Sequence, residues 1–216
     1  MMRVAVLITG RGSNLGALVE AVSVKDFPAE IALVLSSKPD AAGLEIAEKA
    51  GIPTAIIDHN DFDSRTAFDE ALNEHLEAAD IQFICLAGFM RILTEEFVGK
   101  WRDRLINIHP SLLPSFKGRN THERVLHAGV CFSGCTVHFV RPEMDEGPAI
   151  VQAAVPVHAE DSADDLAARV LKAEHHAYPL ALRLIAEGRV RVIDEKVHIE
   201  GAHSPGDYLL NPTEES

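Results

Sequence analysis

Short apolar runs alternate with amphipathic segments along the first half of the chain. The runs are rich in β-branched residues and end at glycine, proline or polar residues, as strands buried on both faces of a sheet do. The expected strands are Arg3–Thr9, Ile31–Leu35, Thr54–Ile57, Ile81–Ala87 and Arg104–Ile108.

Amphipathic helices are expected between these strands. The clearest runs from Ser64 to about Ala79, where Phe68, Leu72 and Leu76 form an apolar stripe at a spacing of four, and Asp63 is expected to cap it. The others are Leu15–Val24 and Ala41–Ala50. Strands alternating with helices predict an α/β fold, with an open, mostly parallel, Rossmann-like sheet and helices on both faces.

The pattern changes after Pro114. Ser162 and Asp165 have capping-box spacing and predict a long helix, which Pro179 is expected to interrupt. The remaining segments predict a short helix, two strands that can pair, and a closing hairpin that forms an antiparallel C-terminal extension. They are, in order, His122–Ala128, Cys135–Val140, Ala149–Val157, and Arg189–Ile193 with Val197–Ile199.

A chain of 216 residues that is 47% hydrophobic suits one domain. We expect a single domain over residues 1–203, with an N-terminal half of about 1–100 that binds phosphate and a C-terminal catalytic half of about 101–203. The polar segment 204–216 is expected to be a loose tail.

The net charge of −13 disfavours a nucleic-acid partner, although a local pocket can still bind a small anion. Three cysteines (Cys85, Cys131 and Cys135) without a CxxC motif argue against a disulfide framework and a cysteine zinc site, so we expect buried free thiols and no metal. The sequence shows neither a signal peptide nor an apolar run of membrane-spanning length, and we expect a cytoplasmic protein without membrane contact.

A glycine-rich turn, Gly10-Arg11-Gly12-Ser13-Asn14, separates the first strand from the first helix. Glycines let a ligand approach the backbone, and a helix N-terminus offers free N–H groups to an anion, so the turn predicts a phosphate site. An ordinary tight turn is the alternative. The dinucleotide motif fits less well because Gly16 comes one residue late and Ser36-Ser37-Lys38 supplies no acid for an NAD ribose, which leaves an NADP enzyme possible.

Polar side chains gather around the run Asn107-Ile108-His109-Pro110-Ser111-Leu112-Leu113-Pro114. Residues i and i+2 of a strand share a face, so Asn107 and His109 can reach one carbonyl oxygen. A carboxylate beside His109 would orient the ring and favour the imidazolium, and Asp145 is the candidate, with a simple turn residue as the alternative. His138 lies among apolar neighbours and can equally be a hydrogen-bonded core histidine.

Apolar residues continue past a strand in the run from Leu86 to Leu93. A loop of this composition can line a pocket for a flat aromatic ligand, or it can simply pack beneath the next helix.

Together these motifs resemble the phosphoribosylglycinamide formyltransferases, folate-dependent enzymes of purine synthesis. The resemblance spans nearly the whole chain, and the Asn-x-His-Pro-Ser-Leu-Leu-Pro run is its most specific part. The other matching segments are Gly10–Leu15, Phe62–Arg65, Ala87–Leu93, the Asp145 turn and Glu174–Pro179.

The resemblance implies attack of the amine of 5′-phosphoribosylglycinamide on the formyl carbon of 10-formyltetrahydrofolate, through a tetrahedral oxyanion. It implies that Asn107 binds the formyl oxygen, that protonated His109 stabilises the oxyanion, and that Asp145 supports the imidazolium. The implied phosphoribosylglycinamide site is Gly12, Ser13, Asn14, Leu171, Lys172, Ala173 and Glu174. The implied folate site is Arg65, Met90, Arg91, Ile92, Leu93, Asn107, Arg141, Pro142, Glu143, Met144 and Asp145.

The chain departs from the family at Lys117, where proline is usual, and in the run from Arg141 to Met144.

A methionyl-tRNA formyltransferase is expected to have a larger C-terminal domain and a basic surface. A formyltetrahydrofolate hydrolase is expected to carry an N-terminal regulatory domain, which a chain starting at its first strand lacks. A non-catalytic folate or nucleotide binder and an NADP reductase remain as alternatives. We expect small-molecule substrates only and a monomer or homodimer.

Overall fold

The computed structural model describes residues 1–203, 206 and 209–211. Its main feature is a seven-stranded sheet in the order β3-β2-β1-β4-β5-β6-β7. The strands from β3 to β5 run parallel, whereas β6 and β7 pair antiparallel. The mostly parallel sheet is therefore confirmed. The strands are β1 (Met2–Ile8), β2 (Ala29–Ser36), β3 (Thr54–Ile56), β4 (Phe83–Leu86), β5 (Leu105–His109), β6 (Phe132–Phe139) and β7 (Ala149–Pro156).

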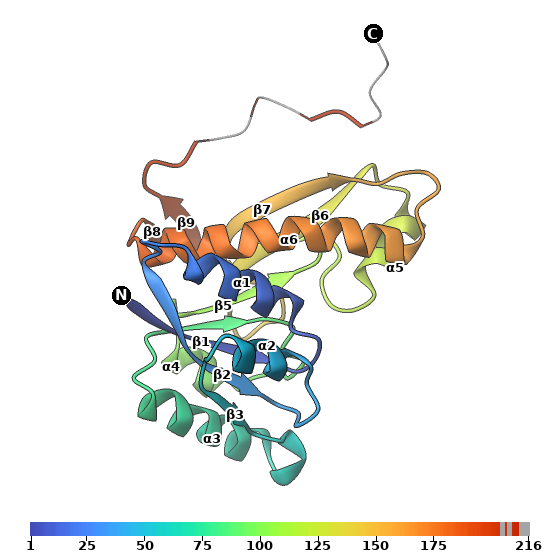
Figure 1. Cartoon of the computed structure of the whole chain (residues 1–216). Helices are drawn as coiled ribbons and strands as arrows, with labels where there is room; N and C mark the ends of the chain where they lie inside the picture. Colours follow the sequence, from blue (N-terminus) through green and yellow to red (C-terminus); the bar gives the residue numbers. More distant parts are fainter. Residues whose placement is uncertain (204–205, 207–208, 212–216) are drawn as a thin grey trace.

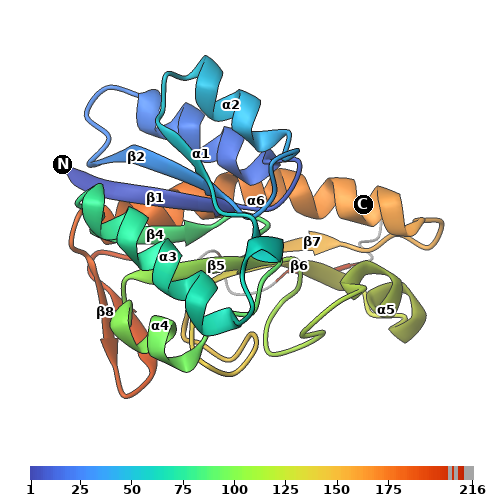
Figure 2. The same ribbon diagram turned by 90° about the horizontal axis from the view of Figure 1, so that it is seen from below.

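Helices cover both faces of the sheet, as expected. Figure 2 shows α1, α2 and α6 on one side and α3 and α4 on the other. The bounds are α1 (Ser13–Ser23), α2 (Gly43–Lys49), α3 (Arg65–Ala78), α4 (Glu95–Lys100), α5 (Thr121–Ala128) and α6 (Ala163–Ala186), with a short 3-10 helix, η1, at His59–Asp61. Residues on alternate sides of β1 enter two separate cores: Val4 and Val6 pack with α1 and α6, whereas Ala5 and Leu7 pack with α3 and α4.

Two expectations about helix ends were wrong. Ser64, not Asp63, caps α3, because the Ser64 hydroxyl accepts a hydrogen bond from Ala67 N at 3.1 Å. Pro179 does not interrupt α6, which continues to Ala186. The buried side chains of Tyr178 and Ala181 on either side of the proline offset its missing hydrogen bond, a cost of about 3 kcal/mol. The capping box of Ser162 and Asp165 is present.

The closing hairpin forms a sheet of its own from β8 (Val190–Ile193) and β9 (Lys196–Ile199). Figure 1 places the hairpin at the C-terminal end of α6. The expected loose tail largely lies outside the described residues, which omit 204–205, 207–208 and 212–216.

Among the described residues, no helix is long and apolar enough to cross a membrane. Cys85 and Cys135 are buried free thiols as expected, whereas Cys131 is exposed.

Candidate active site

The turn after β5 is held from one side by β6 and β7. Thr136 Oγ1 donates a hydrogen bond to Ser111 O at 2.7 Å and accepts one from Leu113 N at 3.0 Å. Gln152 Nε2 donates to Leu113 O at 2.9 Å. The Leu113–Pro114 peptide bond is cis. The backbone that follows His109 is thus pinned to the antiparallel part of the sheet. Sequence reasoning missed Thr136 and Gln152 because their contacts cross 23 to 39 positions of chain.

Asn107 is the middle residue of β5 and His109 its last, so the two lie two positions apart on the same strand. In the register of the sheet, Asn107 lies opposite His138 and His109 opposite Thr136. Among the described residues, the half-buried Asn107 amide has no side-chain hydrogen bond. It therefore offers a donor to a ligand atom beside His109.

The His109 ring is buried between two oxygen atoms. Its Nε2 donates to Phe116 O at 3.0 Å, and its Nδ1 lies 3.4 Å from Asp145 Oδ2. Two facing acceptors are satisfied together only when both ring nitrogens carry protons. The structure thus brings together His109 and Asp145, a contact that sequence spacing alone left open.

Asp145 sits in the loop between β6 and β7 with φ 57, in the left-handed region. Two residues on, Gly147 passes so close to the preceding strand that an added Cβ would lie 1.6 Å from Phe139 O. Asp145 Oδ2 also accepts a hydrogen bond from Gly118 N at 2.9 Å. These constraints hold the carboxylate, which is only 8% exposed, against the imidazole.

His138 is a second buried imidazole near the same carboxylate. Its Nδ1 donates to Phe139 O at 2.9 Å, and its Nε2 lies 4.0 Å from Asp145 Oδ1 without a hydrogen-bond partner among the described residues. Burial lowers the pKa of His138, an effect that the hydrogen bond to Phe139 and the charge of Asp145 partly oppose. His138 is therefore a neutral histidine at neutral pH.

The glycine-rich turn leaves the N-terminus of α1 open. Gly12 is the N-cap residue with φ 74, and α1 has neither a side-chain cap nor an acid in its first turn. An added Cβ at Gly12 would lie 2.6 Å from Gly43 Cα, so close packing on α2 also demands glycine here. The uncapped N–H groups and the helix dipole make this end of α1 suitable for an anion.

Glu174 on α6 reaches the same end of α1. Its Oε2 accepts a hydrogen bond from Asn14 Nδ2 at 2.7 Å, across 160 positions of chain. Burial raises the pKa of the Glu174 carboxyl, and the bond from Asn14 opposes this effect. The Asn14 side-chain oxygen is buried without a partner in the described chain. The neighbouring Leu171 and Ala173 are half-buried, and Lys172 is exposed.

The loop after β4 presents apolar side chains to solvent. Met90 is 70% and Ile92 60% exposed, whereas Leu93 is buried. Met90 N donates to Thr9 Oγ1 at 2.9 Å, which fixes the loop to the end of β1. Exposed apolar groups on a fixed loop form a wall that a flat ligand can cover.

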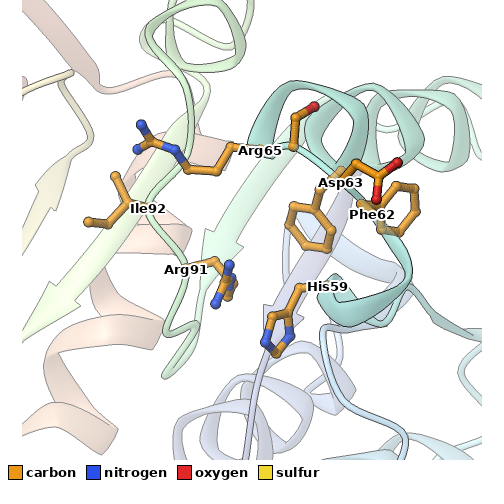
Figure 3. A pocket seen from close by; sticks show the side chains of 8 residues that line it. His59, Phe62, Asp63, Arg65, Arg91 and Ile92 are labelled. Carbon is orange, nitrogen blue, oxygen red and sulfur yellow. The ribbon is translucent and has the colours of Figure 1, made fainter.

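A pocket of about 210 Å³ lies beside this loop (Figure 3). Arg65 comes from the start of α3, Arg91 from the loop after β4 and His59 from η1, and Phe62 and Ile92 supply apolar walls. Two guanidinium groups at one pocket favour a ligand with carboxylates.

The loop from Pro142 to Met144 is exposed and lies next to Asp145. The Arg141 side chain is buried and points to other partners: its Nη2 donates to Asp103 Oδ1 at 2.7 Å and its Nε to Glu195 Oε2 at 2.6 Å. Lys117 forms an ion pair with Glu146.

Among the described residues no group of three or more His, Cys, Asp or Glu side chains is arranged to hold a metal ion.

Comparison with known proteins identifies relatives of this chain. A family model described as "Formyl transferase" matches residues 2–182. The trifunctional purine biosynthetic protein adenosine-3 of Gallus gallus is 54% identical over 88% of this chain, which spans only 19% of that protein's length. The phosphoribosylglycinamide formyltransferase of Haemophilus influenzae is 40% identical over 98% of this chain and 100% of its own.

A solved structure gives the same result for the fold. The glycinamide ribonucleotide transformylase 1 of Symbiobacterium toebii superposes with a TM-score of 0.90 at 45% identity, over 92% of this chain and 94% of its own. The residues matched by the family model, 2–182, include both the glycine-rich turn and the His109 turn.

Proposed function

The chain belongs to the formyl transferase family, and from this premise we propose that it transfers a formyl group from 10-formyltetrahydrofolate to the amine of 5′-phosphoribosylglycinamide. The products are the formylglycinamide ribonucleotide and tetrahydrofolate, in purine biosynthesis. The observation that carries the proposal is the convergence of three groups: the Asn107 amide, the imidazole of His109 and the carboxylate of Asp145. Similarity to phosphoribosylglycinamide formyltransferases over nearly the whole chain supports the choice of substrates.

The formyl donor fits between the loop after β4 and the loop from Arg141 to Asp145. Exposed Met90 and Ile92 offer apolar contact to the flat pterin. The pocket with Arg65 and Arg91 would then receive the carboxylates of the glutamyl end. Leu93, Pro142, Glu143 and Met144 complete the proposed donor site, with Arg141 contributing through its backbone.

The acceptor fits at the N-terminus of α1. Uncapped N–H groups of Gly12, Ser13 and Asn14 would bind the ribose phosphate. Glu174, held by Asn14, would accept hydrogen bonds from ribose hydroxyls. Leu171, Lys172 and Ala173 border the same end of α1, and Lys172 would add a positive charge near the phosphate.

The chemistry follows from these positions. The amine attacks the formyl carbon, and negative charge develops on the formyl oxygen, where Asn107 would donate a hydrogen bond. Protonated His109 would donate a second one from Nε2, exchanging Phe116 O for the oxyanion. Each such donor can lower a barrier by roughly 3–4 kcal/mol. The carbon–nitrogen bond to the folate then breaks, the folate nitrogen takes a proton, and the attacking amine loses one. Asp145 would stabilise the imidazolium and assist that proton transfer.

A turnover assay tests the proposal. Tetrahydrofolate release from 10-formyltetrahydrofolate is followed by absorbance with and without phosphoribosylglycinamide. We expect release only when the amine is present. Equal release without the amine would make the protein a hydrolase, and no release despite binding of both ligands would make it a non-catalytic binder. NADPH fluorescence that stays unchanged on mixing with the protein would dispose of the reductase alternative.

A further inference from the structure

The loop that carries Asp145 has a buried arginine as its second residue. Arg141 lies just after β6, and its side chain is only 6% exposed. Its guanidinium makes charge-assisted bonds to Asp103 Oδ1 and Glu195 Oε2, and its Nη1 donates to Val140 O at 3.0 Å. A buried guanidinium that is satisfied in this way keeps one geometry, because moving it would leave an unpaired charge away from water.

The two carboxylates come from separate turns. Asp103 lies between α4 and β5 with φ 58, and Glu195 lies in the turn of the β8–β9 hairpin with φ 55. Asp194 shares that turn with φ 49, and Ile193 pairs with Lys196 across it. A two-residue turn with both residues left-handed matches the twist of a hairpin and holds its side chains in fixed directions. The hairpin turn can therefore aim Glu195 at Arg141.

The hairpin is outside the main sheet and supplies none of the residues assigned to either substrate. Figure 2 shows β8 reaching down past the edge of the sheet toward α4. Arg102, two residues after α4, forms a second ion pair with Glu195. Ion pairs thus connect the hairpin turn both to the segment after α4 and to Arg141 near the start of the Asp145 loop.

We propose that Glu195 and Asp103 are positioning residues for catalysis. By fixing Arg141 they hold the segment 141–147, so that Asp145 meets His109 and the segment forms one wall of the formyl-donor site. The part of this inference that concerns the donor rests on the proposed function. The part that concerns the segment itself does not.

Hydrogen exchange on the whole chain tests the inference directly. Backbone amide exchange is measured by mass spectrometry in peptides covering residues 140–148, for the wild type, Glu195→Gln, Glu195→Ala and Asp103→Asn. The matched control is Glu187→Gln, which removes a carboxylate paired with Arg189 beside the same hairpin. Both partners of Arg141 are partly exposed, so we expect exchange in this segment to quicken by about 3- to 10-fold in Glu195→Ala, less in Glu195→Gln, and not in the control.

Kinetics supply the second readout. We expect the KM for 10-formyltetrahydrofolate to rise by about 3- to 10-fold in Glu195→Ala and Asp103→Asn, while the KM for phosphoribosylglycinamide stays within about 2-fold. Unchanged exchange in residues 140–148 would overturn the proposal. So would faster exchange spread evenly over the domain, because Glu195 would then stabilise the fold in general. Segment-specific exchange in a protein that transfers no formyl group would uphold the positioning role and contradict the proposed function instead.

Discussion

Asp145 Oδ2 lies 3.4 Å from His109 Nδ1, and the same oxygen accepts a hydrogen bond from Gly118 N at 2.9 Å. One carboxylate oxygen therefore links the β6–β7 loop, the end of β5 and the segment before α5. The position of the imidazole depends on all three, and Asp145 lies 27 positions from Gly118 and 36 from His109 along the chain.

Asp145→Asn tests this relationship. Asparagine keeps the size of the side chain and tolerates the left-handed backbone, but it removes the negative charge that stabilises the imidazolium. We expect kcat to fall by roughly 10²- to 10⁴-fold with both KM values nearly unchanged. Steady-state kinetics check it. Asp80→Asn is the control, because Asp80 is an exposed aspartate with φ 50 at the opposite end of the sheet. A near-normal kcat in Asp145→Asn would remove Asp145 from the mechanism.

Glu174→Gln should make the folded protein more stable at neutral pH, relative to the wild type, and weaken binding of the acceptor. Burial raises the pKa of Glu174, so the folded protein holds this proton more tightly than the unfolded chain does. Stability is then lost as the pH rises from the ordinary value of a glutamate toward the raised one. We expect the Tm of Glu174→Gln, relative to the wild type, to increase from about pH 4 to about pH 7.5. A Tm difference that does not depend on pH would contradict the argument.

The same variant should bind its acceptor more weakly. A carboxylate accepts hydrogen bonds from two hydroxyls more strongly than an amide does. We expect the KM for phosphoribosylglycinamide to rise by about 10-fold while the KM for the folate stays the same. Glu160→Gln, at an exposed position before α6, is the control.

Arg65 and Arg91 should recognise the acidic end of the formyl donor. We expect Arg65→Ala and Arg91→Ala each to raise the KM for 10-formyltetrahydrofolate by about 5- to 30-fold, since each loses a charge-assisted bond. The matched measurement uses the 10-formyl donor without glutamate, for which the wild type and both variants should behave alike. Equal losses on the two donors would assign the arginines to folding or to another ligand. Arg3→Ala, on the far end of β1, serves as the control.

Lys117 pairs with Glu146, the residue after Asp145. The pair is partly exposed, so its contribution is small. We expect Lys117→Ala to lower kcat/KM for the folate by no more than about 5-fold, and Lys117→Glu combined with Glu146→Lys to recover most of the loss. A double exchange as poor as the worse single variant would show that the ion pair itself has no role.

Most of the fold could be predicted because it follows local patterns. The strands of the parallel sheet are apolar runs, and α3 and α6 have clear periodicity and capping signals. Two errors came from short-range rules that tertiary packing overrides. Ser64 and Asp63 are both good capping residues, and only the backbone geometry selects Ser64. The continuity of α6 at Pro179 depends on burial against neighbouring elements, which sequence spacing does not reveal.

The candidate site was less predictable where its contacts are long-range. Asn107 and His109 share a strand, so their common face followed from periodicity. The approach of Asp145 to His109 depends on the path of the loop between β6 and β7, 36 positions further along the chain. The family resemblance implied that Arg141 belongs to the folate site, whereas its side chain binds two carboxylates elsewhere. Its partners lie 38 and 54 positions away, and nothing in the local pattern indicates them.

The transfer of the formyl group itself is the most direct test of the account. The enzyme is supplied with 10-formyltetrahydrofolate labelled with ¹³C in the formyl group and with phosphoribosylglycinamide, and the products are followed by mass spectrometry. We predict that the wild type places the label on the glycinamide nitrogen, and that His109→Ala does so roughly 10³-fold more slowly while still binding phosphoribosylglycinamide within a few-fold. Label released as free formate, or a His109→Ala rate close to that of the wild type, would contradict it.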